Sequence, residues 1–253
     1  MEKVNPISIV GAGPGAIDLL TIRALDRIKN ADVLVWTDSL ISPDIADLTT
    51  KNCEKFRTSS LTLEQILELL ITKAKQGLKV VRLHDGDPCL YGAISEQICG
   101  LADEGLEVEV IPGISAYQAT AAELQKELTI PGVVQTIVLS RTNGRTRVPE
   151  SENLENLAKI GASLCLYLSA RHIEDVQEQL LRHYQEDTPV AIAHRVTWQD
   201  QWLKIVPLKN LALESREKGL FRTTLYIISP ALKLHNQRSN LYHESHKHLF
   251  RSK

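Results

Sequence analysis

The first residues with chemical potential form a glycine-rich turn, Gly11–Ala16 (GAGPGA), between a strand-like and a helix-like run. The turn satisfies the pattern G-x-G-x-x-G/A, and Asp38 follows at about the distance of a ribose-binding acid. Small residues let backbone amides approach an anionic group near a helix start. Taken alone, the turn predicts a dinucleotide site or a generic tight turn.

Two features weigh against a dinucleotide site. A second glycine-rich loop spans residues 84–92 (HDGDPCLYG), and no nicotinamide or flavin signature follows. Asp38 and His84 both lie at carboxyl ends of predicted parallel strands, where such sheets bind ligands, so both are candidate weak bases. The alternatives are a helix or turn cap for Asp38, a packed, hydrogen-bonded histidine for His84 and a simple turn for Asp87-Pro88.

Arginines cluster in one polar loop of the second half, at Arg141, Arg145 and Arg147. Planar guanidinium groups bind carboxylates through two parallel hydrogen bonds, so the loop predicts a polyanion site, with a solvated basic loop as the alternative. The segment 242–248 (YHESHKH) contains histidines that could bind cobalt or zinc, but its spacing is not H-E-x-x-H. We therefore predict no metal site.

Short β-branched runs alternate with amphipathic stretches, the pattern of parallel βα units. Predicted strands cover 7–10, 32–36, 80–83, 108–111, 136–140, 164–168, 190–193, 202–206 and 224–228. Predicted helices cover 19–29, 63–76, 94–104, 154–159, 173–183 and 208–218. No helix separates 190–193 from 202–206, which should pair antiparallel. We expect two α/β domains, 1–124 with a mostly parallel sheet and 125–233 with a mixed sheet, followed by a loosely ordered polar tail, 234–253.

Composition limits the class of protein. The net charge of −2 argues against non-specific nucleic-acid binding, which needs a basic excess. Four cysteines, with no C-x-x-C pair, are typical of reduced thiols rather than a zinc site or disulfides. No apolar run approaches the roughly 20 residues that span a bilayer, and the N-terminus runs straight into a strand. We expect a cytoplasmic protein that binds neither membrane nor nucleic acid.

Three motifs, in order and spacing, resemble the tetrapyrrole (corrin and porphyrin) methyltransferases. The first begins at Val10–Gly15 and continues through Asp18–Thr21, the second is Val80–Gly92 with its G-D-P, and the third is Val110–Ala116 with its P-G-I-S. Finer features resemble the precorrin-4 C11-methyltransferase branch: His84, 91–97, 127–131, 135–141, 144–146 and 149–150. The resemblance covers about residues 6–230. One departure is Ala16, where the family usually carries aspartate.

The resemblance implies an S-adenosylmethionine-dependent C-methyltransferase that acts on precorrin-4 or cobalt-precorrin-4, and a homodimer. It implies a cofactor site in the cleft between the domains. The implied cofactor-binding residues are Asp85, Gly86, Asp87, Leu90, Tyr91, Ser115, Ala116, Leu168 and Val196. It places the first glycine turn on the substrate side, with Gly11, Gly13, Pro14 and Gly15, together with Arg141, Arg145 and Arg147. Asp38 and His84 are the candidate catalytic residues.

Other functions stay open from the sequence. Another methyltransferase of the superfamily, such as a precorrin-2 or precorrin-3 methyltransferase or a diphthine synthase, would share the three motifs. A non-catalytic tetrapyrrole-binding protein would share the fold. A nicotinamide oxidoreductase would use the first glycine turn alone.

Overall fold

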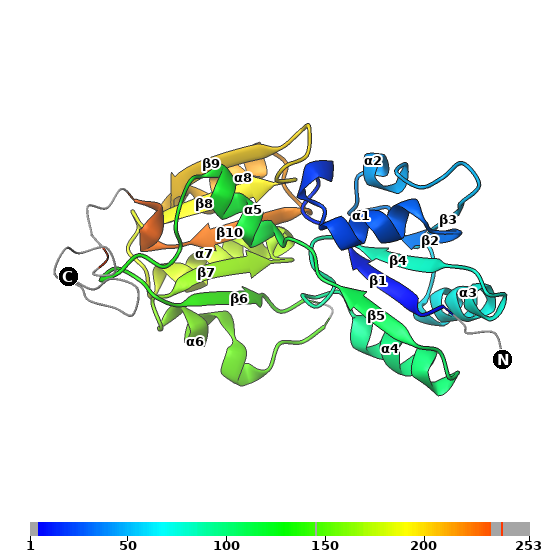
Figure 1. The fold of residues 1–253 in the computed structure, drawn as a ribbon. Helices are drawn as coiled ribbons and strands as arrows, with labels where there is room; N and C mark the ends of the chain where they lie inside the picture. Colours follow the sequence, from blue (N-terminus) through cyan, green and yellow to red (C-terminus); the bar gives the residue numbers. More distant parts are fainter. Residues whose placement is uncertain (1–4, 145, 234–238, 240–253) are drawn as a thin grey trace, which may run out of the picture. The chain divides into compact units, whose positions relative to one another are not determined.

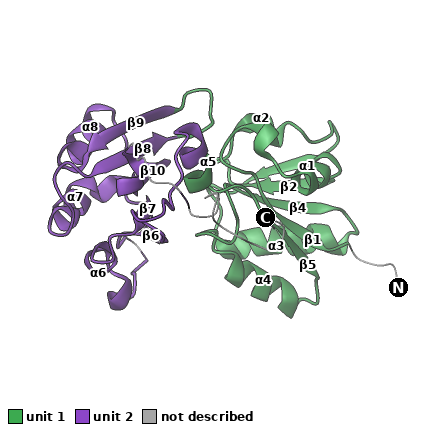
Figure 2. Ribbon diagram, turned by 60° about the vertical axis from the view of Figure 1, so that its left-hand side comes forward, with its two compact units in different colours: residues 1–119, 195–201 green, residues 120–194, 202–253 purple. Residues whose placement is uncertain are grey.

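The computed structural model describes residues 5–144, 146–233 and 239 (Figure 1). These residues divide into two compact α/β units (Figure 2). Unit 1 contains the residues up to 119 together with 195–201, and unit 2 contains 120–194 and the residues from 202 onward. The return of 195–201 to unit 1 was not among the sequence expectations, which assigned that segment to the C-terminal domain. The predicted polar tail lies, except for Ser239, outside the described residues.

Unit 1 is built on a five-stranded sheet in the order β3-β2-β4-β1-β5. All its pairings are parallel. The strands are β1 (Ile7–Gly11), β2 (Val33–Trp36), β3 (Glu54–Arg57), β4 (Val80–His84) and β5 (Val108–Ile111). Because the strands are parallel, the loops that follow β4, β1 and β5 emerge side by side at one edge of the sheet.

Helices cover both faces of this sheet. They are η1 (Ile17–Leu19), α1 (Ile22–Lys29), α2 (Pro43–Ala46), α3 (Leu63–Lys75) and α4 (Ile94–Asp103), with α5 (Ala116–Glu123) at the unit boundary. Alternate strand residues point to opposite faces. Leu34 and Leu83 pack in a core with α1 and α2, whereas Val33 and Val35 pack in a core with α3 and α4. Arg82 and His84 share the α3–α4 face, because they alternate with Leu83 along β4.

Unit 2 contains a mixed sheet in the order β6-β7-β10-β8-β9. Its strands are β6 (Ile137–Arg141), β7 (Ser163–Tyr167), β8 (Pro189–His194), β9 (Trp202–Pro207) and β10 (Thr224–Ile228). Only β6 and β7 pair parallel; the predicted antiparallel pairing of β8 with β9 is confirmed. The remaining elements are η2 (Glu150–Glu152), α6 (Leu154–Ala158), η3 (Ala170–His172), α7 (Ile173–Leu181), η4 (Leu208–Asn210), α8 (Leu211–Glu217) and η5 (Pro230–Leu232).

The α/β class, with a parallel first sheet and a mixed second sheet, is confirmed. Two differences concern elements that lack a strong hydrophobic pattern. β3 (EKFR) is an edge strand with exposed side chains, and α5 (AYQATAAE) has no apolar stripe. Both were left without a prediction, because hydrophobic periodicity detects only elements that bury one face. None of the helices in the described part of the chain is long and apolar enough to cross a membrane.

Candidate functional site

The three motif loops meet backbone to backbone at the carboxyl edge of the unit 1 sheet. Gly13 and Gly86 exchange two hydrogen bonds, from Gly13 N to Gly86 O at 3.1 Å and from Gly86 N to Gly13 O at 2.9 Å. Ala12 N also donates to His84 O at 2.7 Å. The first glycine turn is therefore hydrogen-bonded at its base to the second loop.

Close packing explains why two of the motif positions are glycine. A Cβ atom on Gly11 would lie 2.6 Å from Gly113 N, and one on Gly113 would lie 2.1 Å from Gly86 O. Both distances are far below van der Waals contact, and the opposing atoms are backbone. Glycine at 11 and 113 thus permits contact between loops of the protein itself, rather than approach of a ligand phosphate.

Asp87 joins the second loop to the third. Its Oδ1 accepts from Cys89 N and its Oδ2 accepts from Gly113 N, each at 2.9 Å. The bond from Cys89 N is the one expected if Asp87 simply forms a turn. The bond from Gly113 N is a contact between two loops, which no local sequence pattern indicates. Each carboxylate oxygen retains further acceptor capacity.

The second loop carries unusual backbone geometry around its predicted cofactor residues. Tyr91 and Ala93 adopt left-handed conformations with φ of 59° and 49°. A Cβ on Gly92, between them, would lie 2.3 Å from Pro88 O. Non-glycine residues held in this region cost about 1–3 kcal/mol each and cluster at functional sites. Tyr91 is 42% exposed, so this backbone presents an aromatic side chain to solvent.

Asp85 and Leu90 flank this strained turn. Leu90 is half-buried, and Asp85 keeps an exposed surface although protein atoms surround much of its carboxyl group. Desolvation by these atoms raises the pKa of Asp85 above its ordinary value, against the opposing effects of a backbone hydrogen bond and the Arg82 charge. On the third loop, Ser115 is buried at the start of α5, and its N donates to Gln118 Oε1 at 2.9 Å. Ala116 is half-buried and begins α5.

His84, the last residue of β4, is buried beside a buried arginine, Arg82. Arg82 Nη1 donates to Leu83 O at 2.9 Å and Arg82 Nε to Gln97 Oε1 at 3.2 Å. The Nε2 atom of His84 makes no hydrogen bond to any described atom. Burial, together with the positive charge of Arg82, lowers the pKa of His84 to about 3. The imidazole is therefore neutral at physiological pH and a weak base.

Asp38 follows β2 and is already engaged by its own unit. Its Oδ1 accepts from Ser59 N at 3.0 Å and its Oδ2 from Ser59 Oγ at 2.9 Å. Burial raises the pKa of Asp38, but the bonds from Ser59 outweigh that effect, so its pKa lies below the ordinary value. The geometry matches the turn-cap alternative, with an ionised carboxylate.

The burial of neutral His84 predicts a loss of stability in acid. The unfolded chain binds a proton at His84 below its ordinary pKa of 6.5, whereas the folded chain binds it only near pH 3. Because the unfolded state holds more protons between these values, the free energy of unfolding falls as pH drops through this window. The expected slope is about 1 kcal/mol per pH unit.

Urea unfolding at pH 7.5, 6, 5 and 4 of the wild type and His84→Gln measures this effect. As the pH is lowered, we expect the free energy of unfolding of the wild type to fall relative to that of His84→Gln. The value at pH 7.5 is the control, because the imidazole is deprotonated in both states there. A pH-independent difference would contradict the assignment of a buried neutral imidazole.

In unit 2, Leu168 follows β7 in a left-handed conformation with φ of 53° and is 66% exposed. Ser169 Oγ beside it donates to Tyr167 O at 2.7 Å and accepts from Thr142 N at 3.2 Å. The ends of the parallel strands β6 and β7 are thereby joined. An exposed leucine on strained backbone is a candidate ligand contact.

The arginines of the polar loop differ in availability. The Arg141 guanidinium donates to three carbonyls of its own loop, those of Thr142, Thr146 and Arg147, at 3.4, 2.9 and 3.2 Å. It therefore shapes the loop, a role that the carboxylate-binding prediction did not include. Arg147 is exposed, and Arg145 lies outside the described residues.

Comparison with known proteins places these loops in a family. The model of the tetrapyrrole (corrin/porphyrin) methylases matches residues 6–212. The cobalt-precorrin-4 C(11)-methyltransferase of Methanocaldococcus jannaschii is 38% identical, covering 99% of this chain and 98% of that protein. The precorrin-4 C(11)-methyltransferase of Pseudomonas aeruginosa is also 38% identical, covering 97% of this chain and 98% of its own.

The chain belongs to the tetrapyrrole methylase family. A solved X-ray structure of a cobalamin biosynthetic enzyme, cobalt precorrin-4 methyltransferase, superposes with a TM-score of 0.87 at 36% identity, covering 90% of this chain and 96% of that one. The resemblance seen in the three motifs is confirmed by the family model, by the related sequences and by the solved structure.

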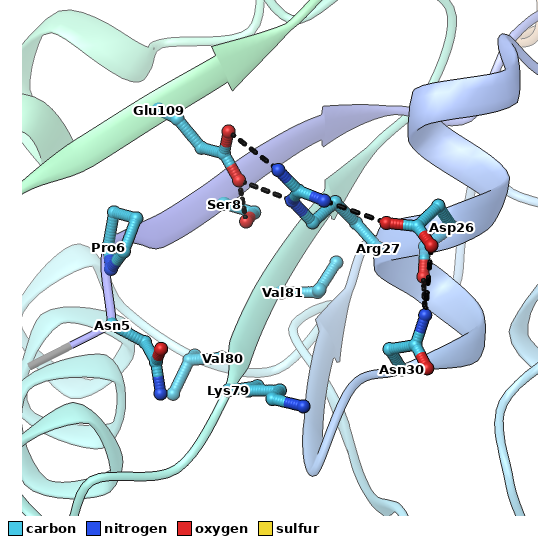
Figure 3. A pocket seen from close by; sticks show the side chains of 10 residues that line it. All are labelled: Asn5, Pro6, Ser8, Asp26, Arg27, Asn30, Lys79, Val80, Val81 and Glu109. Carbon is cyan, nitrogen blue, oxygen red and sulfur yellow. Dashed lines mark hydrogen bonds and ion pairs between the residues drawn. The ribbon is translucent and has the colours of Figure 1, made fainter.

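The methylase also has a polar pocket at the opposite, amino-terminal edge of the unit 1 sheet, with a volume of about 290 Å³ (Figure 3). Glu109 accepts there from Ser8 Oγ and from Arg27 Nε, each at 2.6 Å, and Arg27 also binds Asp26. The hydrogen bond from Arg27 lowers the pKa of Glu109. Since these groups satisfy one another, the pocket is a structural ion-pair cluster rather than the candidate site. Within the described ranges, no three His, Cys, Asp or Glu side chains gather as metal ligands would; the tail 242–248 lies outside them.

Two residues of the methylase's 195–201 segment contact the first glycine turn and were missing from the sequence expectations, Thr197 and Trp198. Val196, which was predicted to contact the cofactor, lies between β8 and these residues; it is 5% exposed and belongs to unit 1. No motif in the segment indicates these contacts, since they join residues more than 180 positions apart.

Proposed function

We propose that this methylase transfers a methyl group from S-adenosylmethionine to C11 of precorrin-4 or cobalt-precorrin-4 in cobalamin biosynthesis. The supporting observation is the meeting of the three motif loops at one sheet edge, in a chain that matches relatives named for this reaction over nearly its whole length. In a parallel sheet this edge is the one that binds ligands.

The residues of the second and third loops fit the proposed cofactor, which supplies an electrophilic methyl group on a sulfonium. The backbone of Gly86 is free of a side chain, with φ of 55°, and strained Tyr91 presents an exposed ring. Leu168 offers an exposed apolar contact on unit 2. The proposed cofactor-binding residues are Asp85, Gly86, Asp87, Leu90, Tyr91, Ser115, Ala116, Leu168 and Val196.

Alignment rather than proton transfer carries most of the proposed catalysis. Methyl transfer from a sulfonium to a carbon is a direct displacement and needs no enzyme nucleophile; well-oriented reactants account for roughly 7–11 kcal/mol of the barrier. His84, with a pKa of about 3, and Asp38, bound to Ser59, would accept the product's proton only weakly. We retain both as proposed proton acceptors, and we assign the larger effect to the rigid loops.

The substrate side is proposed to contain the first glycine turn, through Gly11, Gly13, Pro14 and Gly15, and the arginine loop. Corrin precursors carry many carboxylates, which guanidinium groups bind well. Exposed Arg147 fits this role directly, whereas Arg141 supports it by shaping the loop. Arg145 is included in the proposal on the family resemblance alone.

A methyl-transfer assay tests the proposal. S-adenosylmethionine with a carbon-13 methyl group is incubated with precorrin-4 and, in parallel, with cobalt-precorrin-4, and the product is analysed by NMR. We expect label at C11, and the faster substrate identifies the metal state of the ring. Label at another carbon would assign the protein to a different branch of the superfamily.

Calorimetry with S-adenosylhomocysteine separates an enzyme from a non-catalytic tetrapyrrole-binding protein. We expect saturable binding with a stoichiometry of one per chain. Absence of binding would favour the carrier protein. We further propose, on the family resemblance, a cytoplasmic homodimer, and light scattering of the purified protein measures its mass directly.

A further inference from the structure

Residues 195–201 form a tightly ordered turn between β8 and β9. Trp198 N donates to Arg195 O at 2.9 Å, and Thr197 N donates to Gln201 Oε1 at 2.7 Å. The Arg195 guanidinium stacks on the Trp198 ring at 4.2 Å and pairs with Asp200. Arg195 and Thr197 adopt left-handed φ values of 47° and 66°, so the turn holds strained backbone at two non-glycine residues.

This turn contacts the tip of the first glycine loop, which is in the same unit. Trp198 Nε1 donates to Pro14 O at 3.0 Å, and Ala16 N donates to Thr197 Oγ1 at 3.0 Å. The indole ring also covers Gly15, where a Cβ atom would lie 2.3 Å from Trp198 Cδ1. The side chains of residues 197 and 198 thus bind all three residues of the tip.

The base and the tip of the glycine loop have different supports. The base is bound to the second motif loop, through Ala12 to His84 and through the Gly13–Gly86 pair. The tip, Pro14–Ala16, is bound by Thr197 and Trp198. Loss of these two side chains would free the tip while leaving the contact between the motif loops intact.

We propose that Thr197 and Trp198 are positioning residues that hold the glycine-loop tip in the conformation that binds the tetrapyrrole, and that they set the affinity for the tetrapyrrole without affecting the affinity for S-adenosylmethionine. The inference rests on the proposed function, which assigns the tip to the substrate side and assigns the second and third loops, Leu168 and Val196 to the cofactor. It also explains glycine at position 15: the space of a side chain is filled by the indole.

Three variants remove different parts of the contact between the turn and the glycine-loop tip. Thr197→Val removes the acceptor for Ala16 N, Trp198→Phe removes the donor to Pro14 O but keeps a ring over Gly15, and Trp198→Ala removes both. Gln199→Ala is the matched control, because Gln199 is exposed in the same turn and has no part in these contacts. Enzyme assays of each protein measure kcat and the KM for the tetrapyrrole. Absorbance titration measures the dissociation constant of the tetrapyrrole, and calorimetry measures that of S-adenosylhomocysteine.

We expect the tetrapyrrole KM and dissociation constant to rise about three- to fivefold in Trp198→Phe and Thr197→Val, as for loss of one hydrogen bond, and about tenfold in Trp198→Ala, which also loses the ring over Gly15. Affinity for S-adenosylhomocysteine should change less than twofold in every variant, and Gln199→Ala should match wild type. A merely structural role would weaken both ligands together. Unchanged tetrapyrrole affinity, or a parallel loss of cofactor affinity, would overturn the inference.

If Trp198→Ala does not fold, Thr197→Val and Trp198→Phe still test the positioning role. If wild-type protein binds the tetrapyrrole but labels a carbon other than C11, the proposed function fails while the dissociation constants still test the positioning. If the wild-type protein does not bind the tetrapyrrole at all, both proposals fall.

Discussion

Replacement of Asp87 by alanine is expected to lower kcat/KM about 30-fold and to weaken S-adenosylhomocysteine binding by a similar factor. The carboxylate accepts the amides of Cys89 and Gly113, so its removal separates the second motif loop from the third. Hydrogen bonds to a charged group are worth about 1.5–3 kcal/mol when desolvated, and these are partly exposed. We therefore expect a loss of about 2 kcal/mol in the placement of the two loops.

Kinetics with labelled cofactor, together with calorimetry, measure this loss. Asp87→Asn should fall between wild type and alanine, because the amide oxygen can accept one of the two amides but the amide nitrogen would oppose the other. Asp103→Asn, at an exposed residue near the end of α4, is the matched control. Wild-type cofactor affinity in Asp87→Ala would show that the loops are positioned without the carboxylate.

Replacement of Gly113 by alanine should reduce both stability and activity, through a clash that no side-chain rotation relieves. The added Cβ would lie 2.1 Å from Gly86 O and 3.0 Å from Gly11 Cα, all on backbone. Overpacking of buried sites costs about 1–3 kcal/mol, and we expect the upper end, about 3 kcal/mol, since backbone must move. Displacing the third loop also disrupts the amide that binds Asp87.

Urea denaturation and the methyl-transfer assay together measure this effect. Gly144→Ala is the control for the denaturation measurement, because a Cβ there has nothing within 4 Å. It should leave the free energy of unfolding near that of the wild type. A stable and active Gly113→Ala protein would show that the three loops do not need the backbone contact found here.

The fold was largely predictable because its buried strands carry β-branched runs. The strands that pair in the centre of each sheet, such as β1, β4 and β10, matched their predicted ranges to within a residue or two. β3 and α5 escaped prediction, since neither buries a periodic apolar face. The antiparallel β8–β9 pair was predicted, but the packing of its connecting turn with unit 1 was not.

The residue types of the site could be predicted from the sequence, but the structural roles of these residues were predicted less well. Glycine at 11, 13 and 15 first suggested amides open to an anion. In the structure the neighbouring amides bind protein acceptors: Ala12 N binds His84 O, Gly13 N binds Gly86 O and Ala16 N binds Thr197 Oγ1. The glycines serve close contact with other parts of the chain, and a dinucleotide would find those amides occupied.

The sequence by itself determined the family, the α/β class and the presence of the three motif loops at the ends of predicted strands. It could do so because motif spacing and hydrophobic periodicity are local properties of the chain. The tertiary structure alone decided which partners these residues have. It placed Asp87 on Gly113 N, turned Arg141 onto its own loop, buried His84 beside Arg82 and brought Trp198 onto Gly15. Such contacts depend on strand order and on burial. Strand order and burial both result from the packing of segments that are distant in the sequence. A short-range sequence pattern does not contain information on that packing.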